Sequence, residues 1–157
     1  MRVTLIAIGR LKSGPERDLF EDYRRRLARG AALGPLEIKE VEARGKLSGE
    51  ELKAREGELL LVALPEGARL VALDERGTDL DSAGFAEKLG AWRDQGVREV
   101  AFVVGGADGL SEDLRRRADL VLSFGRLTWP HKLVRPLLAE QLFRAETILS
   151  GHPYHRE

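Results

Sequence analysis

Short runs of apolar, often β-branched residues alternate along the chain with longer stretches in which apolar residues recur every three or four positions. The first pattern predicts strands and the second predicts helices. In chain order, the predicted strands cover residues 3–9, 36–42, 69–74, 99–104 and 119–123. The predicted helices cover residues 15–30, 49–64, 82–95, a short segment after Ser111, and 133–150.

Some of these boundaries depend on single residues. Residues 59–64 are continuously apolar and could form a strand instead of the end of a helix. Ser111 is a suitable N-cap residue, since its hydroxyl can accept from the first helical amides. Pro136 has no amide hydrogen, so the last regular helix is predicted to begin near Val134, with Pro136 in its first turn.

The alternation of apolar strands with helices predicts an α/β fold, a parallel sheet with helices on both faces. No linker or repeat interrupts the 157 residues, so we expect a single domain over residues 1–157. Ligands of such sheets bind beyond the carboxyl ends of the strands. Residues 73–77, 105–109 and 124–131 follow strands in this way.

The last predicted helix has a wide apolar surface. At about 100° per residue, its apolar positions cover roughly half of the circumference, while Phe143 falls on the opposite, charged side. Such a width favours packing against a second subunit. A well-buried helix in a monomer, with Phe143 covered by the C-terminal tail, explains the pattern almost equally well.

Charge and composition exclude several function classes. The chain has no cysteine, which excludes disulfides, thiolate metal sites and thiol catalysis. The 26 basic and 26 acidic residues give a net charge of zero. Arg24–Arg26 and Arg115–Arg117 could form RNA-binding patches, but solvated helix faces paired with nearby acids are the simpler interpretation. The apolar run 3–8 is a strand and not a signal peptide, so we expect a cytoplasmic protein with no membrane segment.

The sequence motifs exclude several classes of functional site, and taken singly they assign none. The G-G-A-D-G turn at Gly105–Gly109 could bring backbone amides close to a ligand, because no Cβ stands in the way. The dinucleotide and P-loop glycine patterns are missing, as is any metal-ligand spacing, so no metal is expected. Ser123 and Ser150 lack the turn that a nucleophilic serine needs. His131 could serve the site or simply bond to backbone.

Several stretches together resemble the RlmH family over essentially the full length. This family consists of SPOUT-class methyltransferases that methylate N3 of a pseudouridine in large-subunit (23S) ribosomal RNA. The stretches are V-V-G-G-A-D-G-L (103–110), L-T-W-P-H-K-L-V-R (127–135), A-E-Q-L-F-R-A (139–145) and the terminal H-P-Y-H-R-E (152–157).

The resemblance implies a C-terminal trefoil knot, a homodimer, and S-adenosylmethionine bound among the three strand-end loops. It also implies that the substrate is 23S rRNA, and we expect the assembled ribosome to supply much of the recognition. The implied cofactor-binding residues are Leu73, Gly105, Gly106, Gly125, Arg126, Leu127, Thr128, Trp129 and Pro130.

Methyl transfer needs no enzyme nucleophile and no metal, but it needs a base for the imide proton of the acceptor. With the resemblance in view, His155 is our first choice for this base, with Tyr154 positioning it. Arg144 and Arg156 would hold RNA phosphate or stabilise negative charge on the imide oxygens. Alternatively, the tail contributes only dimer contacts or RNA affinity.

Two functions of other classes compete with this prediction. A non-catalytic, ribosome-associated binding module with a vestigial nucleotide pocket would bind cofactor weakly and would not need His155. A flavodoxin-like enzyme acting on a small molecule is disfavoured, because the chain has no phosphate-binding loop.

Overall fold

Five parallel strands form one sheet in the order β2-β1-β4-β3-β5 in the computed structural model, which describes residues 1–156, the side chain of Arg156 excepted. The strands are β1 (Arg2–Ile8), β2 (Leu36–Val41), β3 (Arg69–Asp79), β4 (Glu99–Val104) and β5 (Leu120–Ser123). The helices are α1 (Pro15–Leu27), α2 (Gly49–Val62), α3 (Ser82–Asp94), α4 (Glu112–Arg117), α5 (His131–Ser150) and a final 3-10 turn, η1 (Pro153–Arg156).

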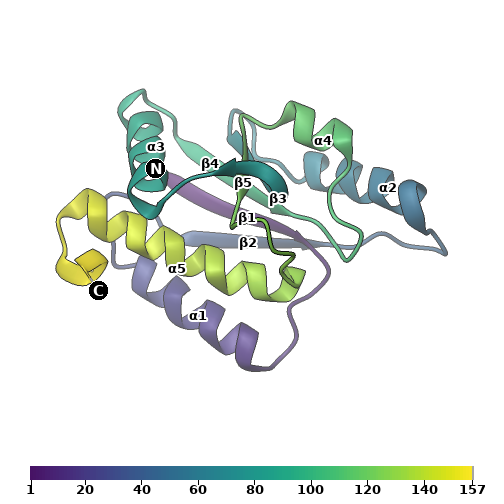
Figure 1. The fold of residues 1–157 in the computed structure, drawn as a ribbon, viewed down its shortest axis with the longest axis horizontal. Helices are drawn as coiled ribbons and strands as arrows, with labels where there is room; N and C mark the ends of the chain where they lie inside the picture. Colours follow the sequence, from purple (N-terminus) through teal and green to yellow (C-terminus); the bar gives the residue numbers. More distant parts are fainter. Residues whose placement is uncertain (157) are drawn as a thin grey trace.

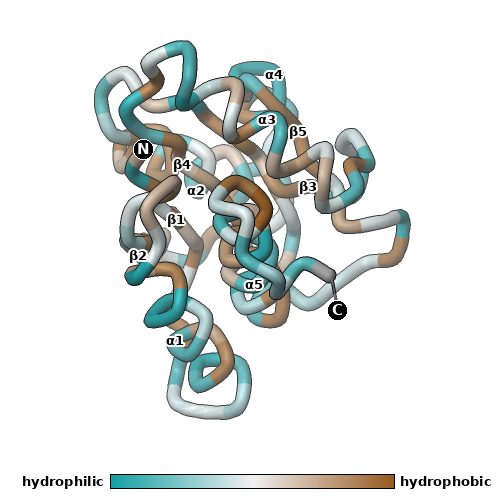
Figure 2. Tube along the Cα trace, turned by 90° about the vertical axis from the view of Figure 1, so that its left-hand side faces the viewer, coloured by the Kyte–Doolittle hydropathy of each residue, from teal (hydrophilic) through white to brown (hydrophobic). Residues whose placement is uncertain are grey.

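Helices cover both faces of the sheet, as the alternating pattern predicted (Figure 1). Leu5 of β1 and Phe102 of β4 point into the core beneath α1, α3 and α5, whereas their neighbours Ile6 and Val103 point into the core beneath α2 and α4. Hydrophobic residues follow β1, β3, β4 and β5 through the interior (Figure 2). The predicted fold class is therefore confirmed. The trefoil knot stays a prediction.

β3 is longer than predicted, because the chain continues past Asp74 and pairs again with β5. The register shifts between Leu73 and Thr78, so the intervening residues bulge. Gly77 makes this approach possible: a Cβ at its position would lie 2.6 Å from the Val121 carbonyl oxygen. The sequence E-R-G-T-D is polar and shows no strand period, which is why the strand was predicted to stop early.

α5 begins at His131, earlier than predicted, and Pro136 therefore lies in the second turn and not in the first. The amides of Leu133 and Val134 both donate to the Pro130 carbonyl, so the helix is already formed there. Pro136 cannot donate to the Lys132 carbonyl, and its ring crowds that carbonyl, so the helix loses one interior hydrogen bond at this turn. Residues 59–64 do not form a strand, since α2 extends to Val62.

The wide apolar surface of α5 is largely used within one chain. Helices α1 and α3 pack on either side of it, in the same core. Phe143 lies against Tyr154 of the tail, with ring centroids 4.7 Å apart, and against Tyr23 of α1 at 6.2 Å. The monomer interpretation thus accounts for Phe143 without a second subunit.

Both arginine clusters lie on helix faces and pair with acids, as the simpler interpretation predicted. In the first cluster, Arg24 pairs with Glu21 at 3.4 Å and Arg26 with Asp22 at 2.9 Å. In the second, Arg116 pairs with Glu112 at 2.6 Å. The remaining members, Arg25, Arg115 and Arg117, pair with Asp22, Asp74 and Asp113.

Glu146 of α5 holds the turn that follows α1. Its carboxylate is 3% exposed and accepts from the amides of Ala31 at 2.9 Å, Ala32 at 3.0 Å and Leu33 at 2.5 Å. Glu146→Gln is expected to lower the free energy of unfolding by about 2 kcal/mol, since a neutral amide replaces a charged acceptor. Urea unfolding measures this, with Glu87→Gln as the matched substitution at an exposed position of α3; an equal loss in both variants would contradict the assignment.

Candidate functional site

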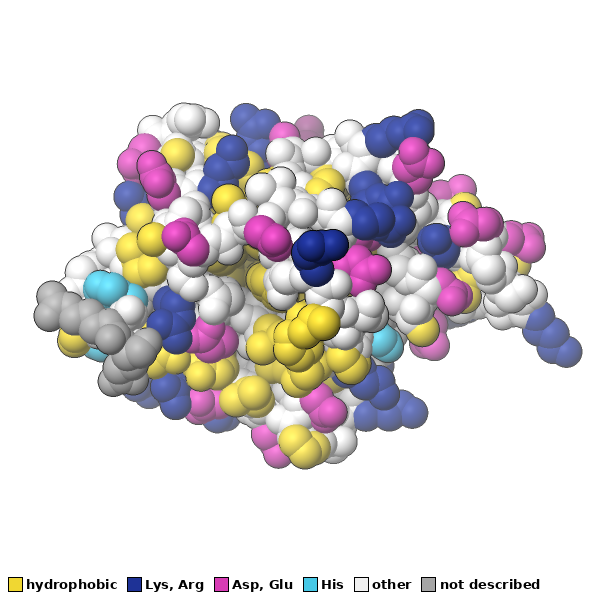
Figure 3. All heavy atoms as spheres, in the orientation of Figure 1, with side chains coloured by type: hydrophobic (Ala, Val, Ile, Leu, Met, Phe, Trp, Pro, Cys, Tyr) yellow, Lys and Arg dark blue, Asp and Glu magenta, His cyan; other side chains and the backbone are white. Residues whose placement is uncertain are grey.

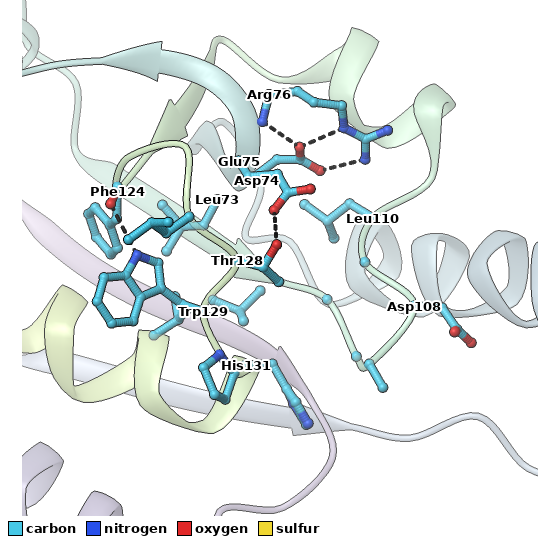
Figure 4. A pocket seen from close by; sticks show the side chains of 18 of the residues that line it. Leu73, Asp74, Glu75, Arg76, Asp108, Leu110, Phe124, Thr128, Trp129 and His131 are labelled. Atoms are coloured by element: carbon cyan, nitrogen blue, oxygen red, sulfur yellow. Dashed lines mark hydrogen bonds and ion pairs between the residues drawn. The ribbon is translucent and has the colours of Figure 1, made fainter.

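A cavity of about 530 Å³ opens at the carboxyl ends of β3, β4 and β5. This volume lies in the range of roughly 300–1,000 Å³ typical of small-molecule sites. Three loops and the start of α5 enclose it (Figure 4). They are the three strand-end segments that the sequence predicted, and the lining residues belong to 73–76, 104–110, 122–125, 127–131 and 134.

Eight of the nine predicted cofactor-binding residues line this cavity. Arg126 belongs to the same loop but is exposed and does not line the cavity. The eight are Leu73, Gly105, Gly106, Gly125, Leu127, Thr128, Trp129 and Pro130.

Hydrogen bonds fix the loop between β5 and α5. Ser123 Oγ donates to the Gly125 carbonyl at 2.7 Å and accepts from the Gly125 amide at 3.1 Å. Thr128 Oγ1 donates to Glu75 at 2.7 Å, and Trp129 Nε1 donates to the Phe124 carbonyl at 3.2 Å (Figure 4). Gly125 has φ +102°, a left-handed conformation that glycine adopts without strain. This wall of the cavity is therefore preformed.

The glycines of the G-G-A-D-G turn also pack closely within the protein, beside the predicted approach to a ligand, which stays a prediction. A Cβ at Gly105 would lie 2.8 Å from the backbone of Gly109, and one at Gly106 would lie 3.0 Å from the carboxylate of Glu56. Gly105 thus needs glycine for packing within the protein, because the neighbouring backbone cannot give way, whereas at Gly106 the Glu56 side chain would have to shift. Glu56 reaches the turn from α2, and the sequence gave no sign of this contact.

Two carboxylates around the cavity have perturbed pKa values. Burial raises the pKa of Asp74, but hydrogen bonds from Arg76 and the charge of Arg115 outweigh burial, so the pKa lies below 3.8. Burial, followed by the charge of Asp108, raises the pKa of Glu56. Asp74 therefore stays ionised. The sequence signal for Asp74 was its place at the end of the predicted strand 69–74, followed by further polar residues.

His131 stands at the first position of α5, in the wall of the cavity (Figure 4). Its Nδ1 is buried without a hydrogen-bond partner in the described part of the chain, so the backbone-bonded alternative does not hold for that atom. Burial, then the charges of Arg135 and Lys132, lowers the pKa of His131 below 6.5. The ring is therefore neutral at pH 7.

The lowered pKa of His131 predicts a pH dependence of stability. Protonation is less favourable in the folded chain, so the unfolded state binds more protons as the pH falls below about 6.5. The free energy of unfolding should decrease through this window towards the folded pKa, and less so in His131→Gln. An NMR titration of the His131 ring gives the folded pKa directly; a value above 6.5 would contradict the prediction.

The predicted catalytic residues lie at the other end of α5. Tyr154 donates to Glu140 Oε1 at 3.2 Å, and its ring lies beneath the guanidinium of Arg144 at 5.1 Å. Arg144 itself donates to Glu140 at 2.7 Å. Burial and the Tyr23 hydroxyl raise the pKa of Tyr154, which suits a donor and not a base. His155 Nδ1 is buried with no partner among residues 1–155.

None of these three residues lines the cavity of its own chain. The tail folds back along α5, so that Tyr154 bonds to Glu140, nine residues after His131 and about 14 Å from it along the helix axis at 1.5 Å per residue. The structure thus brings Tyr154 and Arg144 together, but not with the cofactor-binding loops. The prediction for the side chain of Arg156 falls outside the described residues.

A second cavity of about 560 Å³ lies beside the first and shares Leu122, Phe124, Gly125 and Trp129 with it. It extends along α5 to Glu140 and Gln141. Close by, the β5–α5 loop exposes Leu127 by 72% and Trp129 by 40%. Hydrophobic side chains gather in the centre of the face seen in Figure 3.

A family model described as "Predicted SPOUT methyltransferase" matches residues 1–155, which include the cavity and all of α5. The chain belongs to the SPOUT methyltransferase family. A methyl donor of the S-adenosylmethionine type follows from this membership. The fold class and the family predicted from the sequence are thereby confirmed.

Similar proteins agree with this assignment. The chain is 62% identical over 156 residues to "Ribosomal RNA large subunit methyltransferase H" of Rhodospirillum centenum, covering 99% of each. It is 59% identical to the protein of the same name from Paramagnetospirillum magneticum, again over 99% of each. A solved probable methyltransferase of Bordetella pertussis shares the fold at 15% identity, with a TM-score of 0.53 over 92% of this chain and 95% of that one.

The cavity suits a methyl donor of this type. Leu73, Leu110 and Leu122 give it apolar walls that can hold an adenine ring, and loop backbone groups lie at its edge. The carboxylate of Asp108 at its rim complements a positively charged donor. Within residues 1–156, no group of three His, Asp or Glu side chains could hold a metal ion, and no helix is long and apolar enough to cross a membrane.

Proposed function

We propose that this protein methylates N3 of a pseudouridine in large-subunit (23S) ribosomal RNA, with S-adenosylmethionine as the methyl donor. The observation that carries the proposal is the meeting of three strand-end loops at one cavity in a chain that matches the SPOUT family over residues 1–155. The name of the full-length relatives, ribosomal RNA large subunit methyltransferases, supports the RNA substrate. Such a substrate places the reaction in the cytoplasm.

The donor supplies an electrophilic methyl group, and the chain must present the acceptor to it in line. Leu73, Gly125 and Trp129 form part of the cavity wall and hold the donor by direct contact. The rigid β5–α5 loop keeps these contacts in place, because its turns are closed by Ser123 and Glu75. Preformed walls reduce the entropy that must be lost when donor and acceptor meet.

N3 must lose a proton as the new bond to the methyl carbon forms and the donor's sulfur–carbon bond breaks. His155 accepts this proton in our proposal, with its Nδ1 or Nε2 in reach of the imide nitrogen. Tyr154 stays protonated and positions the acceptor by stacking or hydrogen bonding. Arg144, already oriented by Glu140, stabilises negative charge on the imide oxygens.

Tyr154 is held at Glu140, about 14 Å along the axis of α5 from His131, so the tail does not reach the cavity of its own chain. We infer a homodimer in which the tail of one subunit completes the cavity of the other. The exposed Leu127 and Trp129 and the second cavity beside them offer an apolar surface for this contact. A dimer would also bury the rim of the donor site and exclude water.

The test is methyl incorporation from labelled S-adenosylmethionine into ribosomes, isolated large subunits and protein-free 23S rRNA, all from cells lacking this protein. We expect label on at least one of the ribosomal particles, and nucleoside mass spectrometry should place it at N3 of a pseudouridine. Ribosomes from cells that also lack the pseudouridine synthase for the site are the matched control and should take up no label.

The alternative of a non-catalytic binding module predicts a different result. It would show ribosome binding with no label on any particle and weak donor binding by calorimetry. Donor binding together with label at another nucleoside would keep the methyltransferase but overturn the proposed acceptor.

A further inference from the structure

The carboxyl edge of the sheet continues beyond the donor cavity, over β1 and β2. Because these strands are parallel and Ile8 pairs with Val41, the loops that follow them leave the sheet side by side. β1 also lies next to β4 in the sheet, so its loop is adjacent to the Gly105–Gly109 turn. The two loops, residues 9–14 and 42–48, thus extend the edge that holds the cavity.

These two loops carry four cations, Arg10, Lys12, Arg44 and Lys46, and only one carboxylate, Glu42. All four cationic residues are exposed, and none forms an ion pair with a carboxylate in the described part of the chain. The arginine clusters of α1 and α4 differ in this respect, since each of their members has an acidic partner.

The start of α5 links these loops to the cavity. Arg135 donates to the carbonyls of Ile8 at 2.7 Å and Gly9 at 2.8 Å, which ties the helix to the end of β1. Lys132 is exposed one residue after His131, which lines the cavity. Lys and Arg side chains lie among Asp and Glu side chains on the right-hand part of the face seen in Figure 3. Glu40, the acid nearest to this junction, is already paired with Arg135 at 2.9 Å.

We propose that Arg10, Lys12, Arg44, Lys46 and Lys132, here named the basic edge, bind RNA phosphates beside the nucleotide that enters the cavity. The inference rests on the proposed function and adds the surface that holds the substrate. Unpaired, exposed cations bind phosphates favourably because counterions are released from the RNA. Such contacts fix position and register without reading sequence. A chain of zero net charge can bind RNA in this way, since the cations of this edge form no ion pairs in the described part of the chain.

The experiment compares salt-dependent binding of the full-length protein to large ribosomal subunits and to protein-free 23S rRNA. Two double variants test the loops, Arg10→Ala/Lys12→Ala and Arg44→Ala/Lys46→Ala. The matched control is Arg116→Ala/Arg117→Ala on α4, which removes the same charge from residues that pair with acids. Each loop variant should lower the slope of log affinity against log salt by about 2, and weaken binding on the order of tenfold or more near physiological salt.

Kinetics and donor binding separate this inference from the proposed function. Loop variants should raise KM for the large subunit and leave kcat and donor affinity near wild type, because phosphate contacts are uniform binding. An unchanged slope in both loop variants, or an equal decrease in the control, would overturn the basic edge. A decrease on large subunits but not on protein-free RNA would assign the surface to a ribosomal protein and also overturn it. Absence of methyl transfer by the wild-type protein would overturn the proposed function instead.

Discussion

Mixing two inactive variants is expected to restore methyl transfer to about a quarter of the wild-type activity, if each active site combines the cavity of one subunit with the tail of the other. The first variant, Ala107→Trp, fills the cavity from an exposed position in its lining. The second, His155→Ala, removes the proposed base from the tail. Random pairing makes about half of the dimers mixed, and each mixed dimer contains one complete site out of two.

The physical reason is where α5 holds the tail. His131 lies in the cavity wall, whereas Tyr154 is bound to Glu140, about 14 Å further along the helix axis. A site within one chain would need the tail to leave Tyr23, Phe143 and Glu140, to which Tyr154 is now bound. In that case a mixture could not restore activity, because neither chain would hold both parts.

The two variants should be co-expressed with different affinity tags, so that mixed dimers are purified before methyl transfer is measured; the purified mixed dimers should then show about half of the wild-type activity, since the inactive dimers of each variant have been removed. Each variant alone, carrying both tags in turn, is the control and should stay inactive. Calorimetry should show donor binding by His155→Ala and none by Ala107→Trp. Purified mixed dimers without activity would mean that the subunits do not share their sites.

The layers of this fold were predictable because their signals are local. Continuous apolar runs such as E-V-A-F-V-V indicate strands buried on both faces, and a helix between successive strands requires a parallel sheet. The location of the cavity followed from the same rule, since ligands bind where parallel strands end. The individual donor contacts were predicted from the family resemblance. Of these residues, Arg126 lies in the β5–α5 loop but does not line the cavity.

What the sequence did not reveal depends on contacts between distant residues. Arg135 and Glu146 stand on a helix whose pattern gives charged residues no reason to be buried, yet they are 1% and 3% exposed. Their partners lie about a hundred positions away, at Glu40 and at the turn of residues 31–33. The re-pairing of β3 depends similarly on Gly77 packing against Val121 of another strand. The periodicity of apolar residues along a single segment does not indicate contacts between residues that are distant in the sequence.

Arg135→Met is expected to lower the free energy of unfolding by about 3–5 kcal/mol, the largest loss of stability that we predict for a single side chain. Its guanidinium is 1% exposed and donates to two carbonyls at the end of β1 and to Glu40. Methionine fills a similar volume but donates to neither carbonyl nor to Glu40, which keeps its hydrogen bond from the Leu11 amide. Because Glu40 keeps 30% of its side chain exposed, water can reach it, and the two buried carbonyls account for most of the loss.

Urea unfolding measures this loss, with Lys132→Met as the matched control, since it removes an exposed cation from the same helix turn and should change stability by about 0.5 kcal/mol or less. Arg135→Lys should fall between the two, because an ammonium cannot reach the two carbonyls and Glu40 in the geometry of the guanidinium fork. A loss below about 1 kcal/mol in Arg135→Met would contradict this account.

The same bonds hold the first turn of α5 against β1, and that turn carries His131 into the cavity wall. Donor affinity should therefore decrease in Arg135→Met even under conditions where the variant is fully folded, and stay unchanged in Lys132→Met.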